Sequence, residues 1–137
     1  MIYALDINTI SFLLRPSQNR EVVQKFEEIT AQGHDYVIPP LCYYEINWYL
    51  LRKKANAQLQ VFEQLYHNSA TKISMGEADF VLSARIKADL EERGTPIGSK
   101  DADIFIAAHC IVNGYTLVTD NTSDFERIAG LKIVNWR

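Results

Sequence analysis

Four carboxylates in the second half of the chain stand at the boundaries of expected elements. Asp101 and Asp103 lie where an apolar helix begins, and Asp120 and Asp124 follow a short apolar strand. In α/β proteins, ligands bind in the crevice beyond the carboxyl ends of the strands. These boundaries are therefore positions where acids with a chemical role are expected.

Two further acids occur earlier in the chain. Asp6 directly follows the apolar run at residues 2–5, and Glu45 is the only charge in the otherwise apolar and aromatic run at residues 41–51. A carboxylate in apolar surroundings needs a basic group, a hydrogen bond or a cation as partner. Convergence of these acids on one edge of a sheet would place a cluster of negative charge there.

Such a cluster favours metal-dependent chemistry on phosphates. Carboxylates that share a site raise one another's pKa unless a cation neutralises them. Mg²⁺ and Mn²⁺ prefer oxygen ligands. An ion of this kind can turn water into a hydroxide nucleophile and can stabilise the charge of a reacting phosphate.

Structural roles remain open for the same residues. Asp6 could cap a short helix, and Glu45 could have an ordinary hydrogen-bonding or ionic partner. Asp101 and Asp124 could also be helix caps, because Asp is common at helix starts. The acids alone do not decide between these roles.

Strands that alternate with helices must position the acids. Apolar runs predict strands at residues 2–5, 36–38, 115–118 and 132–134, with a further short strand at 71–73. Helical spacing and stop signals predict helices at residues 20–32, 41–54 and 56–66, and another that ends at the Asn113-Gly114 stop. The fold class is therefore α/β, with a mainly parallel central sheet. The 137 residues suit one domain that spans residues 1–137.

Two helix starts are predicted from capping residues. Asn8, Thr9 or Ser11 would cap a short helix that runs to Leu14. Ser74 and Glu77 form a capping box for a helix that ends at Gly94. The apolar residues of this second helix, at helical spacing, are expected on its buried face; they are Ala78, Val81, Leu82, Ile86 and Leu90.

Composition restricts the possible partners and locations. The formal net charge of −3 gives no general attraction to nucleic acid, so a nucleic-acid partner needs a local basic patch. Candidates for that patch are Arg52, Lys53 and Lys54 at the end of the 41–54 helix, together with Lys100. The sequence has no pattern of a signal peptide and no membrane-spanning run, which makes the cytoplasm the default location.

Cysteine and histidine give no sign of a site of their own. Cys42 and Cys110 each lie in apolar helical sequence and are expected to be buried thiols. No Cys/His spacing suggests zinc, and the three histidines are scattered along the sequence.

Short motifs across the chain resemble one known family. They are Leu5-Asp6-Ile7-Asn8, residues 38–45, residues 94–98, residues 103–109, Leu117 to Asn121, residues 124–127 and the closing Asn135-Trp136. In order and spacing the chain is similar to the PIN-domain nucleases, and within them to the VapC toxins of toxin–antitoxin pairs. The resemblance extends over essentially the whole chain.

The resemblance implies an α/β/α sandwich and a ribonuclease that depends on Mg²⁺ or Mn²⁺. Asp6, Glu45 and Asp103 match the first three acids of the family. Asp6 and Asp103 would hold the metal directly, and Glu45 would hold it or orient the attacking water. The fourth acid stands two residues after the Thr matched by Thr119, so its counterpart here is an asparagine, Asn121.

Neighbouring residues are expected to complete the site. Asp120 or Asp124 would supply the charge that the asparagine lacks. Asn8, Asn121 and Asp101 would lie around the site without holding the metal. Two positions depart from the family pattern: Ile7 replaces the usual Thr, and Tyr49 replaces a residue that is usually small.

The resemblance also implies two protein partners besides RNA. The helix at residues 41–51 has too many aromatic residues for one buried face, and exposed apolar surface marks interaction sites. The hairpin that this helix forms with the next is therefore expected to hold an amphipathic segment of a cognate antitoxin. The family also forms homodimers.

Two other functions remain as alternatives. One is a PIN fold without catalytic activity that binds RNA or protein. The other is a phosphohydrolase of the haloacid dehalogenase type, because Asp6-Ile7-Asn8 loosely resembles the Asp-x-Asp opening of that class.

Overall fold

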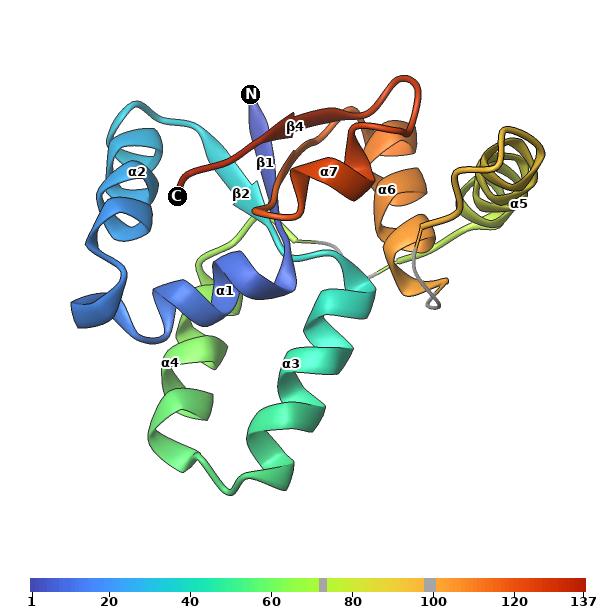
Figure 1. Ribbon diagram of the computed structural model, residues 1–137. Helices are drawn as coiled ribbons and strands as arrows, with labels where there is room; N and C mark the ends of the chain where they lie inside the picture. The colour runs from blue at the N-terminus through green and yellow to red at the C-terminus, as the bar shows by residue number, and fades with distance from the viewer. Residues whose placement is uncertain (72–73, 98–100) are drawn as a thin grey trace.

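The computed structural model describes residues 1–71, 74–97 and 101–137 (Figure 1). Within these residues the strands form one parallel sheet in the order β2-β1-β3-β4. The strands are β1 (Ile2–Leu5), β2 (Asp35–Val37), β3 (Thr116–Val118) and β4 (Lys132–Val134). Each lies within one residue of its predicted position, which confirms the α/β class and the parallel sheet.

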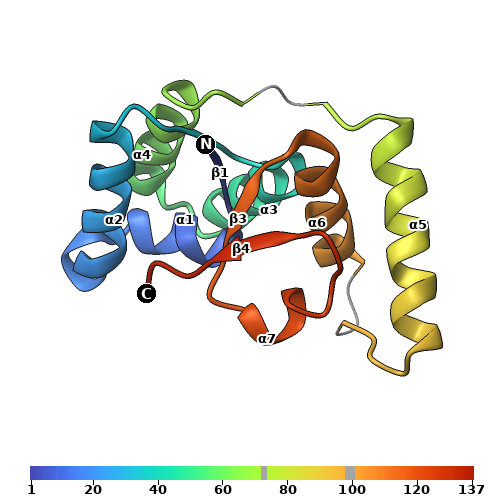
Figure 2. The ribbon, with the colours of Figure 1, turned by 90° about the horizontal axis from the view of Figure 1, so that it is seen from above.

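Helices flank the sheet. They are α1 (Ile7–Leu13), the 3₁₀ turn η1 (Pro16–Gln18), α2 (Arg20–Ala31), α3 (Pro40–Arg52), α4 (Asn56–His67), α5 (Glu77–Glu92), α6 (Ala102–Asn113) and α7 (Thr122–Phe125). The hairpin of α3 and α4 extends away from the sheet, and α2 and α5 lie at opposite sides of the molecule (Figures 1 and 2). No described helix is both long and apolar enough to cross a membrane.

The predicted strand at residues 71–73 is not part of the described sheet. Residues 72 and 73 lie outside the described part of the chain, and Thr71 is not in a strand. Its hydroxyl oxygen instead accepts a hydrogen bond of 2.8 Å from the backbone N–H of Ile38, just beyond β2.

The strand order creates a switch point between β1 and β3. The connection that leaves β1 leads to β2 on one side, and the connection that leaves β3 leads to β4 on the other. Leu5 pairs with Val118 at the ends of the two strands. The next residues, Asp6 and Thr119, therefore stand together where α/β sheets bind ligands.

The two central strands are apolar on both faces because helices cover them. Ala4, Leu5, Leu117 and Val118 are fully buried. This packing gives the strand ends a rigid support.

The start and the buried face of α5 differ from the prediction. The helix begins at Glu77, and Gly76 rather than Ser74 precedes it as the N-cap, so the predicted capping box is wrong. The N–H of Gly76 donates to the carboxylate of Asp79 at 2.8 Å. Ala78 and Val81 are exposed, whereas Ile86 and Leu90 are buried as predicted.

A buried polar pair explains the rotated face of α5. Asp79 Oδ1 lies 2.7 Å from Nδ1 of His109 on α6, and each side chain is about 7% exposed or less. The hydroxyl of Ser83, also buried, donates to the carbonyl oxygen of Asp79 at 2.6 Å. Hydrophobic spacing alone could not reveal a helix face that is partly polar.

Candidate active site

Asp6 has the most fully defined surroundings of the predicted acids. Its carboxylate caps α1 by accepting from the N–H of Ile7 at 2.8 Å, and it is 6% exposed. The hydroxyl of Thr119 donates to the other carboxylate oxygen at 2.8 Å. The capping role considered for Asp6 is thus confirmed, and Asn8, Thr9 and Ser11 are not the caps of this helix.

Burial raises the pKa of Asp6 above its ordinary value. The hydrogen bonds from Thr119 and from the backbone of Ile7 lower the pKa, and the negative charge of Asp120 raises it. Burial dominates because a carboxylate loses its hydration there. The carboxylate would regain stability from a cation beside it, since an opposite charge favours the ionised form.

Replacing Thr119 by valine is expected to raise the pKa of Asp6 further. The substitution keeps the shape of the side chain but removes the hydroxyl that stabilises the ionised carboxylate. The titration midpoint of the Asp6 carboxyl, followed by ¹³C NMR in metal-free protein, should move to higher pH. Thr9→Val is the matched control, because the Thr9 hydroxyl donates to the carbonyl of Val118 instead. An unchanged midpoint in Thr119→Val would contradict this role.

Glu45 and Asp103 lie on two helices that pack against each other, and the helix of Glu45 approaches Asp6 through Cys42. Glu45 is in α3 and Asp103 in the first turn of α6; both are half-buried, and α3 packs against α6. The Sγ atom of Cys42 lies 4.0 Å from a carboxylate oxygen of Asp6. Burial raises the pKa of the Cys42 thiol well above its ordinary value. The charge of Asp6 is the second cause, and Cys110, Glu45 and Asp103 raise the pKa by smaller amounts. The three acids therefore lie within electrostatic reach of one buried thiol.

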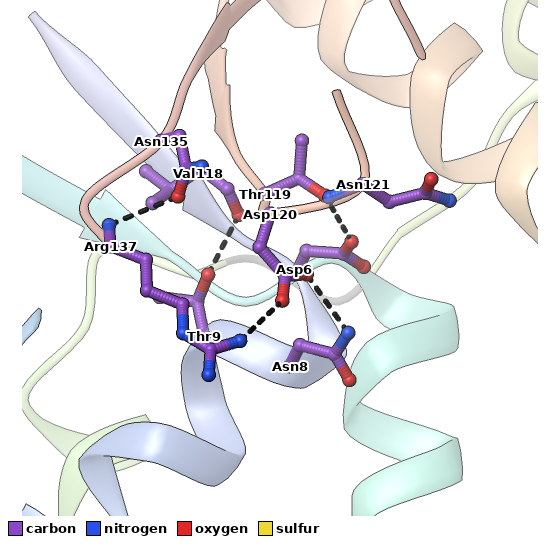
Figure 3. A network of polar contacts seen from close by, with 9 residues as sticks. All are labelled: Asp6, Asn8, Thr9, Val118, Thr119, Asp120, Asn121, Asn135 and Arg137. Carbon is purple, nitrogen blue, oxygen red and sulfur yellow. Dashed lines mark hydrogen bonds and ion pairs between the residues drawn. The ribbon is translucent and has the colours of Figure 1, made fainter. Parts of the chain in front are cut away.

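Asp120 is held by two segments that are distant in sequence. The amide nitrogen of Asn8 donates to one of its carboxylate oxygens at 2.9 Å, and Nη1 of Arg137 lies 3.5 Å from the other. The guanidinium of Arg137 also lies over the ring of Phe12, at 5.0 Å from its centre. Figure 3 shows Asn8, Asp120 and Arg137 gathered beside Asp6. No local pattern in the sequence indicates a role for Arg137, because its partner Asp120 lies 17 residues earlier in the chain.

Asp124 has a different environment. Asn121 occupies the N-cap position of α7, and its side-chain amide donates to Asp124 at 3.1 Å. Asp124 lies inside this short helix, so it does not have the capping role that was left open for it. The backbone N–H of Asn121 donates to the Thr119 hydroxyl, which in turn donates to Asp6 (Figure 3). Asn121 is thereby linked to the first acid through Thr119.

The remaining predicted residues either lie at the surface or fall outside the residues that the structure describes. Asp101 is exposed and its carboxylate pairs with Lys87 at 3.0 Å, so the expected side-chain cap of α6 is not formed. Lys100 lies outside the described residues. The basic residues that follow Leu51 are all exposed; they are Arg52, Lys53 and Lys54.

The donor set suits a hard divalent cation by its chemistry. Asp6 offers a buried carboxylate whose charge is destabilised by burial and by Asp120. Carboxylate oxygens are the ligands that such ions prefer. Across residues 1–71, 74–97 and 101–137, no three His, Cys, Asp or Glu side chains are grouped so that they could hold a metal ion. The chemistry fits a cation, and the side chains would have to close around it.

Comparisons with known proteins agree with this architecture. The sequence profile described as PIN domain matches residues 3–131. The chain is 26% identical over 136 residues to Ribonuclease VapC2 of Rickettsia felis, covering 99% of this chain and 98% of that protein. A shorter stretch of 54 residues, 39% of each protein, is 41% identical to the tRNA(fMet)-specific endonuclease VapC of Salmonella typhimurium. The crystal structure of DNA-bound VapBC from Salmonella typhimurium matches with a TM-score of 0.84 and 25% identity, and covers 100% of this chain and 99% of that one.

Proposed function

Because this chain belongs to the PIN-domain family, we propose that it is an endoribonuclease and the toxin of a toxin–antitoxin pair. The observation that carries the proposal is the buried Asp6 carboxylate at the β1–β3 switch point, with Thr119 and Asp120 beside it. Similarity to Ribonuclease VapC2 along nearly the whole chain supports RNA as the substrate.

The proposed reaction is hydrolysis of a phosphodiester bond. Asp6, Glu45 and Asp103 would hold Mg²⁺ or Mn²⁺, and the bound ion supplies an activated water and neutralises phosphate charge. Thr119 fixes the orientation of the Asp6 carboxylate through its hydroxyl. Asn8 holds the carboxylate of Asp120 close to the site, where its charge acts on Asp6.

Asp120 and Asp124 are expected to differ in how strongly they affect Mg²⁺-dependent cleavage. The same experiment tests the proposed function. Cleavage of a structured RNA is measured against Mg²⁺ concentration, and wild type should lose activity when EDTA removes the ion. Asp120→Asn should raise the Mg²⁺ concentration for half-maximal rate about ten-fold, as loss of groups around a metal site typically does. Asp124→Asn should have a smaller effect, because the charge of Asp120 acts on the Asp6 carboxyl, whereas Asp124 is not among the groups that shift its pKa. Cleavage that persists in EDTA would contradict the mechanism, and equal effects of the two variants would contradict the distinct role of Asp120.

We further propose that the α3–α4 hairpin binds the antitoxin and that the protein forms a homodimer. Tyr44, Trp48, Leu51 and Val61 on this hairpin are all more than half exposed. Apolar surface of this kind is typical of protein interfaces. Similarity to a VapC endonuclease and to a VapBC structure supports the antitoxin as the partner. Light scattering of the purified protein tests the dimer, and a complex that leaves the hairpin exposed would contradict the antitoxin site.

A further inference from the structure

A cavity lies between α1, α3 and α4, apart from the carboxylates. Its volume is about 230 Å³. Its apolar lining is formed by three buried residues, Leu14, Ile46 and Leu50. The polar side chains that line it are Ser11, Arg15, Tyr49, Lys53 and Gln58. Tyr49 is the residue that stands where the family pattern usually has a small one, and it contributes a wall of this cavity.

The cavity is positively charged. Of the described side chains that line it, two are cationic and none is acidic. A hydrogen bond with Lys53 and the charge of Lys53 lower the pKa of the Tyr49 hydroxyl, and the charges of Arg15 and Arg52 lower it further. Three basic groups thus act on one phenol, in a protein whose formal net charge is −3.

Two helices connect the cavity to the acids. The helix α1 begins at its cap Asp6, and Arg15 follows two residues after its end, which corresponds to about 13 Å of helical rise. On α3, Glu45 lies one turn before Tyr49. A single strand of nucleic acid with one phosphate at the acids could therefore run along these helices to the cavity.

We propose that this cavity binds a backbone phosphate of the RNA substrate, away from the bond that is cleaved. Arg15 and Lys53 supply the positive charge, and the Tyr49 hydroxyl and the Gln58 amide supply further hydrogen-bond donors. Proximity to the acids favours RNA over an acidic protein segment as the occupant. This inference rests on the proposed ribonuclease function.

The test measures RNA binding without cleavage. A fluorescein-labelled single-stranded oligoribonucleotide is titrated with the full chain in EDTA, at several salt concentrations, and binding is followed by anisotropy. Arg15→Gln/Lys53→Gln is compared with wild type and with Lys132→Gln. Lys132 is an exposed control at the start of β4, the opposite edge of the sheet from the acids. Tyr49→Phe tests the hydroxyl separately.

We expect Arg15→Gln/Lys53→Gln to bind the oligoribonucleotide about ten-fold more weakly than wild type. Its log–log salt dependence should be shallower by about 0.7 for the lost phosphate contact. Lys132→Gln should match wild type in both quantities, and Tyr49→Phe should weaken binding to a smaller extent. Basic residues at helix ends also balance the helix dipole, but loss of that role alone would lower stability and leave RNA affinity and salt slope unchanged.

Two results would overturn the inference. The first is a double variant with the affinity and salt slope of wild type. The second is a labelled hexaglutamate peptide that binds wild type as tightly as RNA and loses affinity in the double variant, which would assign the cavity to an acidic protein segment. Cleavage by wild type with Mg²⁺ is measured in parallel. Loss of the cavity effect with intact cleavage removes only this inference, whereas absence of cleavage removes the proposed function.

Discussion

Asp6→Asn is expected to reduce RNA cleavage at least about 100-fold at saturating Mg²⁺, because it removes a full negative charge from the proposed metal site. The substitution leaves the fold intact. The asparagine oxygen can still accept from the N–H of Ile7, and its NH₂ group can donate to the Thr119 hydroxyl. The loss therefore reports on chemistry and not on unfolding. Cleavage at the wild-type rate would refute the role of Asp6.

Stability of the metal-free protein gives an independent measure of the same substitution. The pKa of Asp6 is raised in the folded state, so the folded protein binds more protons than the unfolded chain in the window between the two pKa values. Wild type should therefore lose stability as the pH rises from the unfolded pKa through the folded one. Asp6→Asn lacks this loss and should be at least as stable as wild type at pH 7. Asp89→Asn, at an exposed residue of α5, is the control and should match wild type in cleavage.

Asp79→Ala is expected to lower the free energy of unfolding by about 2–4 kcal/mol, because two hydrogen-bonding groups lose their acceptor. The substitution leaves His109 buried without its carboxylate partner and removes the acceptor for the N–H of Gly76. For a domain of this size, the melting temperature should fall on the order of 10 °C. Chemical denaturation followed by circular dichroism measures the change.

A control for this prediction lies on the same helix. Asp89 is exposed and pairs with Arg93 at 2.7 Å, one turn further along. Such surface pairs contribute about 0–1 kcal/mol, so Asp89→Ala should change stability little. Equal denaturation midpoints for Asp79→Ala and Asp89→Ala would mean that the buried pair does not stabilise the packing of α5 on α6.

The strands and the position of the first acid could be predicted from local sequence. Short apolar runs define β1 and β3, and an acid that follows β1 must lie at the carboxyl edge of a parallel sheet. The proximity of Asp120 to Asp6 could be predicted only in part, because it depends on the register in which β1 and β3 pair. Asp120 follows Thr119, the residue that stands beside Asp6.

Features that depend on distant partners were not accessible from the sequence. The buried face of α5 follows from the pair of Asp79 with His109, which hydrophobic spacing counts as polar and places outside. The pairing of Arg137 with Asp120 depends on the segment beyond β4, in which Trp136 packs against Tyr3 and Phe26. The Asp101 side chain pairs with Lys87 from another helix, where local sequence favoured a cap.

The hydrogen bond between Asp6 and Thr119 joins residues that are 113 positions apart. Closing so long a loop costs entropy before the contact can form, and contacts between distant residues form slowly during folding. While β3 is still inside the ribosome during synthesis, β1 cannot pair with it. Asp6 then has no contact with Thr119. On the proposed mechanism, the nascent protein therefore gains its activity only when the two central strands have paired.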